Sequence, residues 1–175
     1  GTLRAAVRHA VRAGRLIAAP DFWMPPPPAP KNRWLAREEA AALLREVRAS
    51  PKMRPYMQLF ILIALYTGQR KEAILSLRWT QIDLIRERID FNQPGRKQTK
   101  KRRPVIPIPS RLARFLRLAQ AQAHCPYVIH RNGRRLDDIK KGFKAACLRA
   151  GLNDVTPHTL RHTAGTWLAQ ASVVL

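Results

Sequence analysis

The chain has 175 residues, and its hydrophobic share of 46% is typical of a folded domain and too high for a disordered one. It carries 33 lysines and arginines, 24 of them arginine, against 11 acidic residues, which gives a net charge of +22. Such a charge favours a polyanionic partner. One arginine guanidinium can donate two parallel hydrogen bonds to phosphate oxygens, and the positive side chains repel one another until an anion binds. The alternative is an ordinary solubilising charge from an arginine-rich genome.

Membrane and secreted classes find no support in the sequence. The longest apolar run, residues 59–66, suits a buried helix and falls well short of the roughly 18 residues of a membrane span. The N-terminal residues lack the apolar region and cleavage site of a signal peptide, and no amphipathic membrane anchor is visible. Cys125 and Cys147 are too few for a disulfide framework, so we expect a reducing cytoplasm. Because the charge is strongly positive and no membrane anchor is visible, we expect nucleic acid as the partner.

The N-terminal part predicts a domain boundary. Residues 3–16 have the apolar spacing of an amphipathic helix, which is too short to be stable alone. Residues 19–34 contain six prolines, which exclude a helix and favour an extended, semi-rigid linker.

From about residue 37 the pattern is mainly helical. Acids in the first turn favour a helix that begins near Arg37, and an apolar helix should end near Gly68. A helix that precedes Gly151 should stop there. The predicted helices of this part are residues 37–49, 52–67, 69–79, 110–123 and 137–150.

Two short hairpins and a last helix complete the prediction. Residues 88–109 contain two β-type runs around a Pro-Gly turn and a basic tip, and residues 127–136 should turn at Asn132-Gly133. Thr156 can cap the last helix, with Pro157 as its first residue and His158 following.

Three polar residues at the start of this last helix form the first candidate site. His158, Arg161 and His162 are spaced i, i+3 and i+4, so they share one helix face near its N-terminus, where an anion is favoured. A zinc site is the alternative, but Thr159 stands where a metalloprotease motif has glutamate, and no acid follows residue 154. A purely structural role, with His162 packed and Arg161 paired, is the third possibility.

Arg70 is the second candidate. It follows Gly68, which ends an apolar helix, and the apolar residues after it should hold it rigidly. A phosphate clamp requires such preorganisation, although the stretch is also compatible with an ordinary capped loop.

The basic hairpin tip is the third candidate. A two-stranded arm that carries lysines can reach into a groove and offer an ammonium group as proton donor, whereas a solvated charge run is the alternative. The candidate basic residues of this tip are Lys97, Lys100, Lys101, Arg102 and Arg103.

Together these stretches resemble the tyrosine recombinase (phage integrase) family in order and spacing. The resemblance rests on Gly68-Gln69-Arg70, the basic hairpin and the box His158-x-x-Arg161-His162, and it covers about residues 37–170. It implies a mainly α fold with a small antiparallel β-hairpin sheet. It also implies three parts: the end of a core-binding domain (1–18), a proline-rich linker (19–34) and a catalytic domain without its C-terminal segment (35–175).

The resemblance implies roles for these residues. Arg70 and Arg161 would clamp the non-bridging oxygens of the scissile DNA phosphate, and His158 would assist proton transfer. Lys100 is the preferred general acid, while Lys97 and Lys101 stay open. The other hairpin basic residues would bind DNA. The family uses neither metal nor nucleotide.

Two departures from the family pattern matter. The family usually has an acid three residues after the first arginine, where this chain has Ala73 and Glu72 stands one place early, so Arg70 is expected to be held differently. The resemblance gives Glu72 and His162 only a supporting role. The family's nucleophilic tyrosine follows the last arginine, whereas Tyr56, Tyr66 and Tyr127 all precede it.

The resemblance therefore predicts a DNA-binding chain whose parent protein integrates or recombines a mobile element. The parent is expected to act as a tetramer on double-stranded DNA, in a bacterial or phage-derived nucleoid setting. A non-catalytic DNA-binding integrase remnant is the alternative, and a basic structural protein of an RNA assembly is a third possibility.

Overall fold

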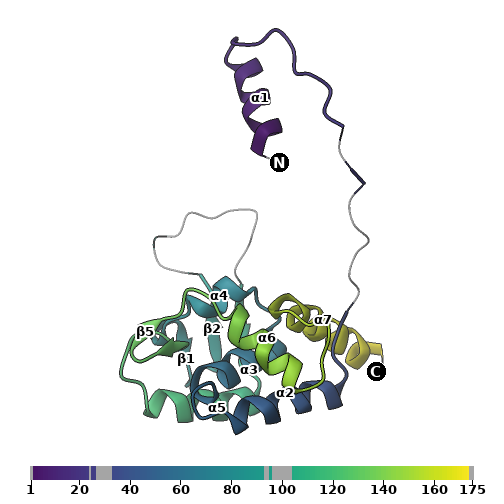
Figure 1. Ribbon diagram of the computed structural model, residues 1–175. Coiled ribbons are helices and arrows are strands. Elements are labelled where there is room, and N and C mark those ends of the chain that lie inside the picture. The colour runs from purple at the N-terminus through teal and green to yellow at the C-terminus, as the bar shows by residue number, and fades with distance from the viewer. Residues whose placement is uncertain (1, 24, 27–32, 93–94, 96–103, 174–175) are drawn as a thin grey trace. The chain divides into compact units, whose positions relative to one another are not determined.

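The computed structural model describes residues 2–23, 25–26, 33–92, 95 and 104–173. They belong to two compact units, Gly1–Lys31 and Asn32–Leu175. Figure 1 labels the elements of both. In chain order the elements are α1 (Thr2–Arg12), α2 (Arg37–Ala49), η1 (Arg54–Gln58), α3 (Leu59–Thr67), α4 (Lys71–Leu75), η2 (Trp79–Gln81), β1 (Ile82–Asp83), β2 (Arg88–Asp90), β3 (Val105–Pro107), α5 (Ser110–Ala121), β4 (His130–Arg131), β5 (Arg134–Arg135), α6 (Lys140–Arg149) and α7 (Pro157–Val173).

The N-terminal unit contains one helix, which ends earlier than its apolar spacing predicts. Helix α1 stops at Arg12, and Gly14 adopts a left-handed φ of 67°. The Arg15 N–H donates to the Ala10 carbonyl and the Gly14 N–H to that of Val11, which is the Schellman arrangement. Gly14 therefore ends the helix instead of extending its apolar side.

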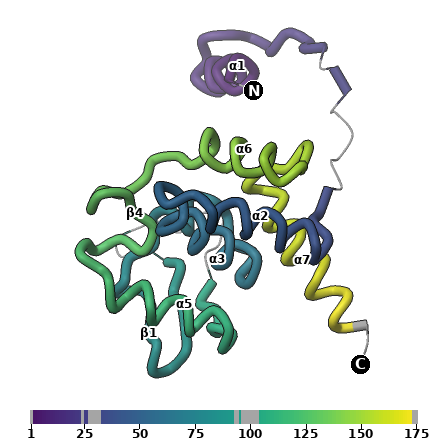
Figure 2. Tube along the Cα trace, turned by 60° about the horizontal axis from the view of Figure 1, so that its bottom comes forward, coloured from purple at the N-terminus to yellow at the C-terminus, as the bar shows by residue number. Residues whose placement is uncertain are grey.

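The larger unit is built around α3, as its all-round apolar sequence predicts. Seven of its nine residues are buried, and α7, α5 and α4 pack against it (Figures 1 and 2). The helix begins after a single π-helical turn, η1, which contains Pro55. It ends at Gly68, whose φ of 60° is left-handed.

The remaining helices enclose this core. Helix α2 packs on η1 and on α6, and the inward faces of both helices are buried. Gly151, with a left-handed φ of 70°, follows α6 as predicted. Among the described residues, no helix combines the length and the apolar character that crossing a membrane requires.

The predicted hairpins are present, and the first gains a strand. Strands β1, β2 and β3 form an antiparallel sheet in that order, with Ile89 opposite both Ile82 and Ile106. Strands β4 and β5 pair around Asn132 and Gly133, whose φ values of 51° and 75° are those of a tight hairpin turn. The fold is thus mainly α with a small antiparallel sheet, as predicted.

Candidate active site

Helix α7 begins at Pro157, as the sequence predicts. The Thr159 N–H donates to the Thr156 carbonyl at 2.9 Å, and the Thr156 N–H donates to Thr159 Oγ1 at 3.0 Å. These two reciprocal bonds hold the first turn of α7, so the backbone positions from which its side chains extend are fixed. His158 and Arg161 are two of these side chains.

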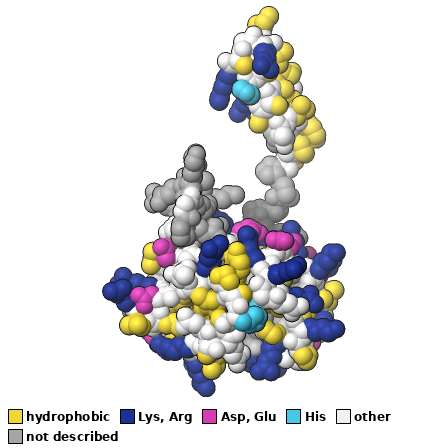
Figure 3. All heavy atoms as spheres, turned by 90° about the vertical axis from the view of Figure 1, so that its left-hand side faces the viewer, with side chains coloured by type: hydrophobic (Ala, Val, Ile, Leu, Met, Phe, Trp, Pro, Cys, Tyr) yellow, Lys and Arg dark blue, Asp and Glu magenta, His cyan; other side chains and the backbone are white. Residues whose placement is uncertain are grey.

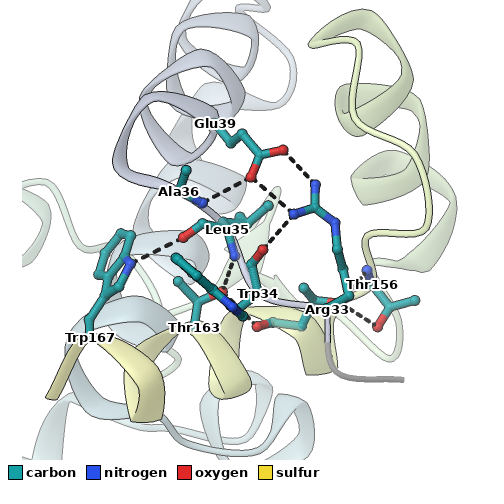
Figure 4. Close-up of polar contacts among 9 residues, drawn as sticks. Arg33, Trp34, Leu35, Ala36, Glu39, Thr156, Thr163 and Trp167 are labelled. Atoms are coloured by element: carbon teal, nitrogen blue, oxygen red, sulfur yellow. Dashed lines mark hydrogen bonds and ion pairs between the residues drawn. The ribbon is translucent and has the colours of Figure 1, made fainter. Parts of the chain in front are cut away.

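Buried polar bonds fix α7 against the segment that precedes α2. The fully buried Thr163 accepts the Leu35 N–H at 2.9 Å and donates to the Thr159 carbonyl at 2.8 Å, and Trp167 Nε1 donates to the Leu35 carbonyl at 3.1 Å (Figure 4). The guanidinium of Arg37 lies 3.8 Å from the centre of the Trp167 ring. Both backbone polar groups of Leu35 therefore bind α7, and the helix cannot rotate without losing them.

Arg161 is anchored on the end of α3. Its Nη1 donates to the Gly68 carbonyl at 2.6 Å, which is short for a charge-assisted bond. A Cβ at residue 68 would lie 3.4 Å from the Ala164 Cβ, so the backbone of Gly68 runs close along α7. Close packing of α3 on α7 thus places the Arg161 guanidinium against the loop that contains Arg70.

Arg70 lies in the same loop, two residues after Gly68. It is the N-cap residue of α4, with an extended backbone and an exposed side chain, while Ala73, Ile74 and Leu75 behind it are buried. In the described part of the chain no hydrogen bond or ion pair of its guanidinium is found. Its place therefore depends on where α4 begins.

The two arginines and His158 act on one another electrostatically. Burial lowers the pKa of Arg161, and the nearby Arg70 lowers it further. Burial also lowers the pKa of His158, and His162, Arg161 and Arg70 add to the effect. The rings of His158 and His162 meet edge to face with their centres 4.6 Å apart. An anion placed among these groups would relieve their repulsion.

A hollow of about 490 Å³ adjoins this cluster. None of the described residues that line it is acidic, so the hollow suits an anion. In the described ranges, no three His, Cys, Asp or Glu side chains are grouped so that they could hold a metal ion. The lining residues with polar side chains are Thr67, Gln69, Arg161, His162 and Thr166.

Strands β2 and β3 form the base of the predicted basic arm. Asp90 of β2 pairs with Val105 of β3, and the buried side chain of Gln81 donates to the carbonyls of Asp90 and Asn92 at 2.7 and 2.9 Å. The Arg78 N–H donates to Gln81 Oε1 at 3.1 Å, so this amide joins η2 to the end of β2. The five basic tip residues predicted from the sequence lie outside the described residues.

The ion-pair partners of Glu72 among the described residues are Lys71 and Arg135. The Glu72 carboxylate lies 3.4 Å from Lys71 Nζ and 3.6 Å from Arg135 Nη2, and Lys71 also binds Asp138. The supporting role predicted for Glu72 stays a prediction. Sequence reasoning did not predict the Lys71–Asp138 ion pair or the bonds of Thr163, since nothing in the spacing of these residues marks them.

Solved structures share the fold. The transposon Tn1549 integrase in complex with transposon right end DNA matches with a TM-score of 0.76 and 18% identity, over 97% of this chain and 65% of that one. A lambda integrase (75–356) dimer bound to a COC′ core site matches with a TM-score of 0.74 and 18% identity, over 97% and 64%. The larger unit thus has the fold of a tyrosine recombinase catalytic core.

The sequence comparison is more specific. Residues 33–175 match the phage integrase family, and the chain belongs to this family. The integrase of Salmonella phage P22 is 28% identical over 186 aligned positions, which cover 98% of this chain and 46% of that protein. The chain therefore spans less than half the length of this curated relative.

Proposed function

We propose that the parent protein of this chain carries out site-specific DNA recombination, cleaving and rejoining strands through a phosphotyrosine intermediate. In this proposal residues 1–175 bind double-stranded DNA and hold the scissile phosphate, and the nucleophile comes from elsewhere in the parent. The observation that carries the proposal is the cationic cluster: Arg161, held on the Gly68 carbonyl at 2.6 Å, beside Arg70 and His158. Membership of the phage integrase family supports it.

The arginines would stabilise charge on the reacting phosphate. Negative charge grows on the non-bridging oxygens during in-line attack, so donors fixed beforehand stabilise the transition state more than the ground state. Arg161 is held in this way by Gly68. The two guanidinium groups already repel one another, and a phosphate between them would convert this repulsion into attraction.

Proton transfer completes the proposed chemistry. A lysine of the arm would protonate the departing 5′ oxygen, with Lys100 preferred over Lys97 and Lys101. The antiparallel β2–β3 ladder supports an arm at this place. Burial and neighbouring cations lower the pKa of His158, which favours the neutral imidazole that can accept a proton before DNA binds.

The three tyrosines of the chain have other surroundings. Tyr56 is buried, Tyr66 lines an apolar groove with Trp167, and Tyr127 lies against the guanidinium of Arg78. Among the described residues, no hydrogen bond joins any of them to Arg70 or Arg161. This supports a nucleophile from outside residues 1–175.

The wider assignment follows the same proposal. The parent would serve a bacterial or phage-derived mobile element, acting at the nucleoid as a tetramer on DNA. Residues 1–18 would close a core-binding domain, and residues 19–34 would link it to the catalytic part. Lysine and arginine side chains spread over the face of the larger unit in Figure 3, among few acidic ones, are consistent with a polyanionic partner.

DNA binding is tested with the chain itself. Affinity for duplex DNA, measured by fluorescence anisotropy at several salt concentrations, should fall steeply as salt rises, since counterions are released on binding. Arg161→Ala should reduce the slope of log K against log salt by about 1. Equal affinity for single-stranded RNA, with no effect of Arg161→Ala, would favour the RNA-assembly alternative.

Cleavage is tested with the parent protein on its recombination site. Arg161→Ala should lower formation of the covalent protein–DNA product by about 10²-fold or more, the usual cost of losing a transition-state donor. Arg114→Ala removes an exposed arginine from α5 and is the matched control. A parent gene with no tyrosine codon after codon 175, and a product that binds DNA without covalent attachment, would favour the non-catalytic remnant.

A further inference from the structure

Arg70 and Arg161 are held by different means, and this difference raises a question about Arg70. Arg161 has a short bond to the Gly68 carbonyl. Arg70 has no such bond among the described residues, and Ala73 occupies the place where the resemblance expects a supporting acid. Because the backbone of Arg70 caps helix α4, the contacts of that helix must set the position of the Arg70 guanidinium.

Helix α4 cannot position Arg70 by itself. It has five residues, which is too few for a helix that is stable on its own. Burial of Ala73, Ile74 and Leu75 fixes its inner face toward the core. Lys71 and Glu72, which directly follow Arg70, are not buried, and a partner on the outer side would fix them in place.

Asp138 supplies that partner. Its Oδ1 lies 2.8 Å from Lys71 Nζ, and the same oxygen accepts the backbone N–H groups of Ile139 at 2.8 Å and Lys140 at 3.3 Å. The hydrogen bond from Lys71, together with the two backbone N–H groups, lowers the pKa of Asp138 to about 2, so the carboxylate is charged at neutral pH. Ile139 is buried, which ties the carboxylate to the packed start of α6.

We infer that Asp138 is a positioning residue for Arg70: through Lys71 it ties the start of α4 to the start of α6 and thereby sets where the Arg70 guanidinium meets the scissile phosphate. The inference rests on the proposed function. Glu72 is the weaker candidate, because its side chain is 56% exposed and its two ion pairs are longer, at 3.4 and 3.6 Å. The Asp138–Lys71 pair is partly exposed, and such pairs contribute little to overall stability.

The test compares two neighbouring carboxylates in the parent protein. Asp138→Asn keeps the size and an oxygen for the α6 N–H groups but removes the charge that binds Lys71. Asp137→Asn makes the same change one residue earlier, at an exposed aspartate with no ion pair in the described part of the chain. Cleavage by Asp138→Asn should be about 10- to 100-fold slower, the range for a catalytic group displaced by up to 1 Å. Asp137→Asn should cleave normally, and DNA affinity should be unchanged in both.

A modified substrate separates positioning of Arg70 from general damage. A methylphosphonate at the scissile position replaces one non-bridging oxygen by an uncharged methyl group. On the diastereomer that lessens the defect of Arg70→Ala, the defect of Asp138→Asn should lessen equally, while that of Arg161→Ala should not. Normal cleavage by Asp138→Asn, or a defect that persists on this diastereomer, would overturn the inference.

A second variant guards against misfolding. Lys71→Met breaks the same pair and leaves the start of α6 intact, so it should reproduce the defect, and the double variant should be no slower than either single one. Additive defects would overturn the inference. If Arg70→Ala and Arg161→Ala themselves cleave normally, the proposed function fails as well, and this result is distinguished from failure of the Asp138 assignment alone.

Discussion

Replacing Gly68 by alanine should impair the site more than the fold. Gly68 has a φ of 60°, in the left-handed region where an alanine costs about 1–2 kcal/mol. The new Cβ would meet the Ala164 Cβ at 3.4 Å, which is ordinary van der Waals contact and adds little. Relaxation of the backbone would, however, move the carbonyl that holds Arg161.

Gly151→Ala is the matched control. Gly151 has a φ of 70°, and a Cβ there would have no neighbour within 4 Å. Both variants should therefore lose about 1–2 kcal/mol of unfolding free energy, since each places alanine in the same strained region. Urea denaturation of the 175-residue chain measures both losses under identical conditions.

Cleavage should separate the two variants. In the parent protein, Gly68→Ala should slow formation of the covalent product by about tenfold or more, because a displaced donor stabilises the transition state less. Gly151→Ala should cleave at the normal rate. In an Arg161→Ala background, Gly68→Ala should add no further loss, because the two changes remove one interaction.

The refuting results are specific. Equal cleavage by the two glycine variants would show that the Gly68 carbonyl does not position Arg161. A further loss on combining Gly68→Ala with Arg161→Ala would show that the glycine acts by another route.

Three further predictions concern the surroundings of the site. Thr163→Val should lower the unfolding free energy by about 1–3 kcal/mol, because it leaves the buried Leu35 N–H without its acceptor, while Thr163→Ser should cost less in the same urea assay. The pKa of His158, measured by NMR, should lie below its ordinary value and should rise when duplex DNA binds. Because the pKa in the folded state is the lower one, the unfolding free energy should fall as the pH drops through about 6.5. An unchanged His158 pKa on DNA would contradict a nearby phosphate. Gln81→Leu should cost about 1–3 kcal/mol in urea denaturation by leaving two carbonyls at the end of β2 unpaired, and a neutral result would show that water replaces the amide.

Several features of the fold follow from local sequence. An apolar run with no polar side predicts that α3 is buried, because no face of it can meet water favourably. Gly68, Gly133 and Gly151 all adopt left-handed φ values at the predicted breaks, since only glycine enters this region without strain. The ends of helices are harder to predict from the sequence. Helix α1 stops at Arg12 because of the hydrogen bonds around Gly14, although its apolar spacing continues.

The sequence by itself determined that His158, Arg161 and His162 share a face, because helical periodicity places residues three and four apart together. Family resemblance, not periodicity, predicted that Arg70 belongs to the same site. Only the tertiary structure decided what holds these groups: the Gly68 carbonyl for Arg161, Thr163 for the backbone of Leu35, and Asp138 for Lys71. The partners in these contacts are 93, 128 and 67 residues apart. No local pattern specifies such pairs, since they arise from the packing of α7 on α3 and from the place where α6 begins.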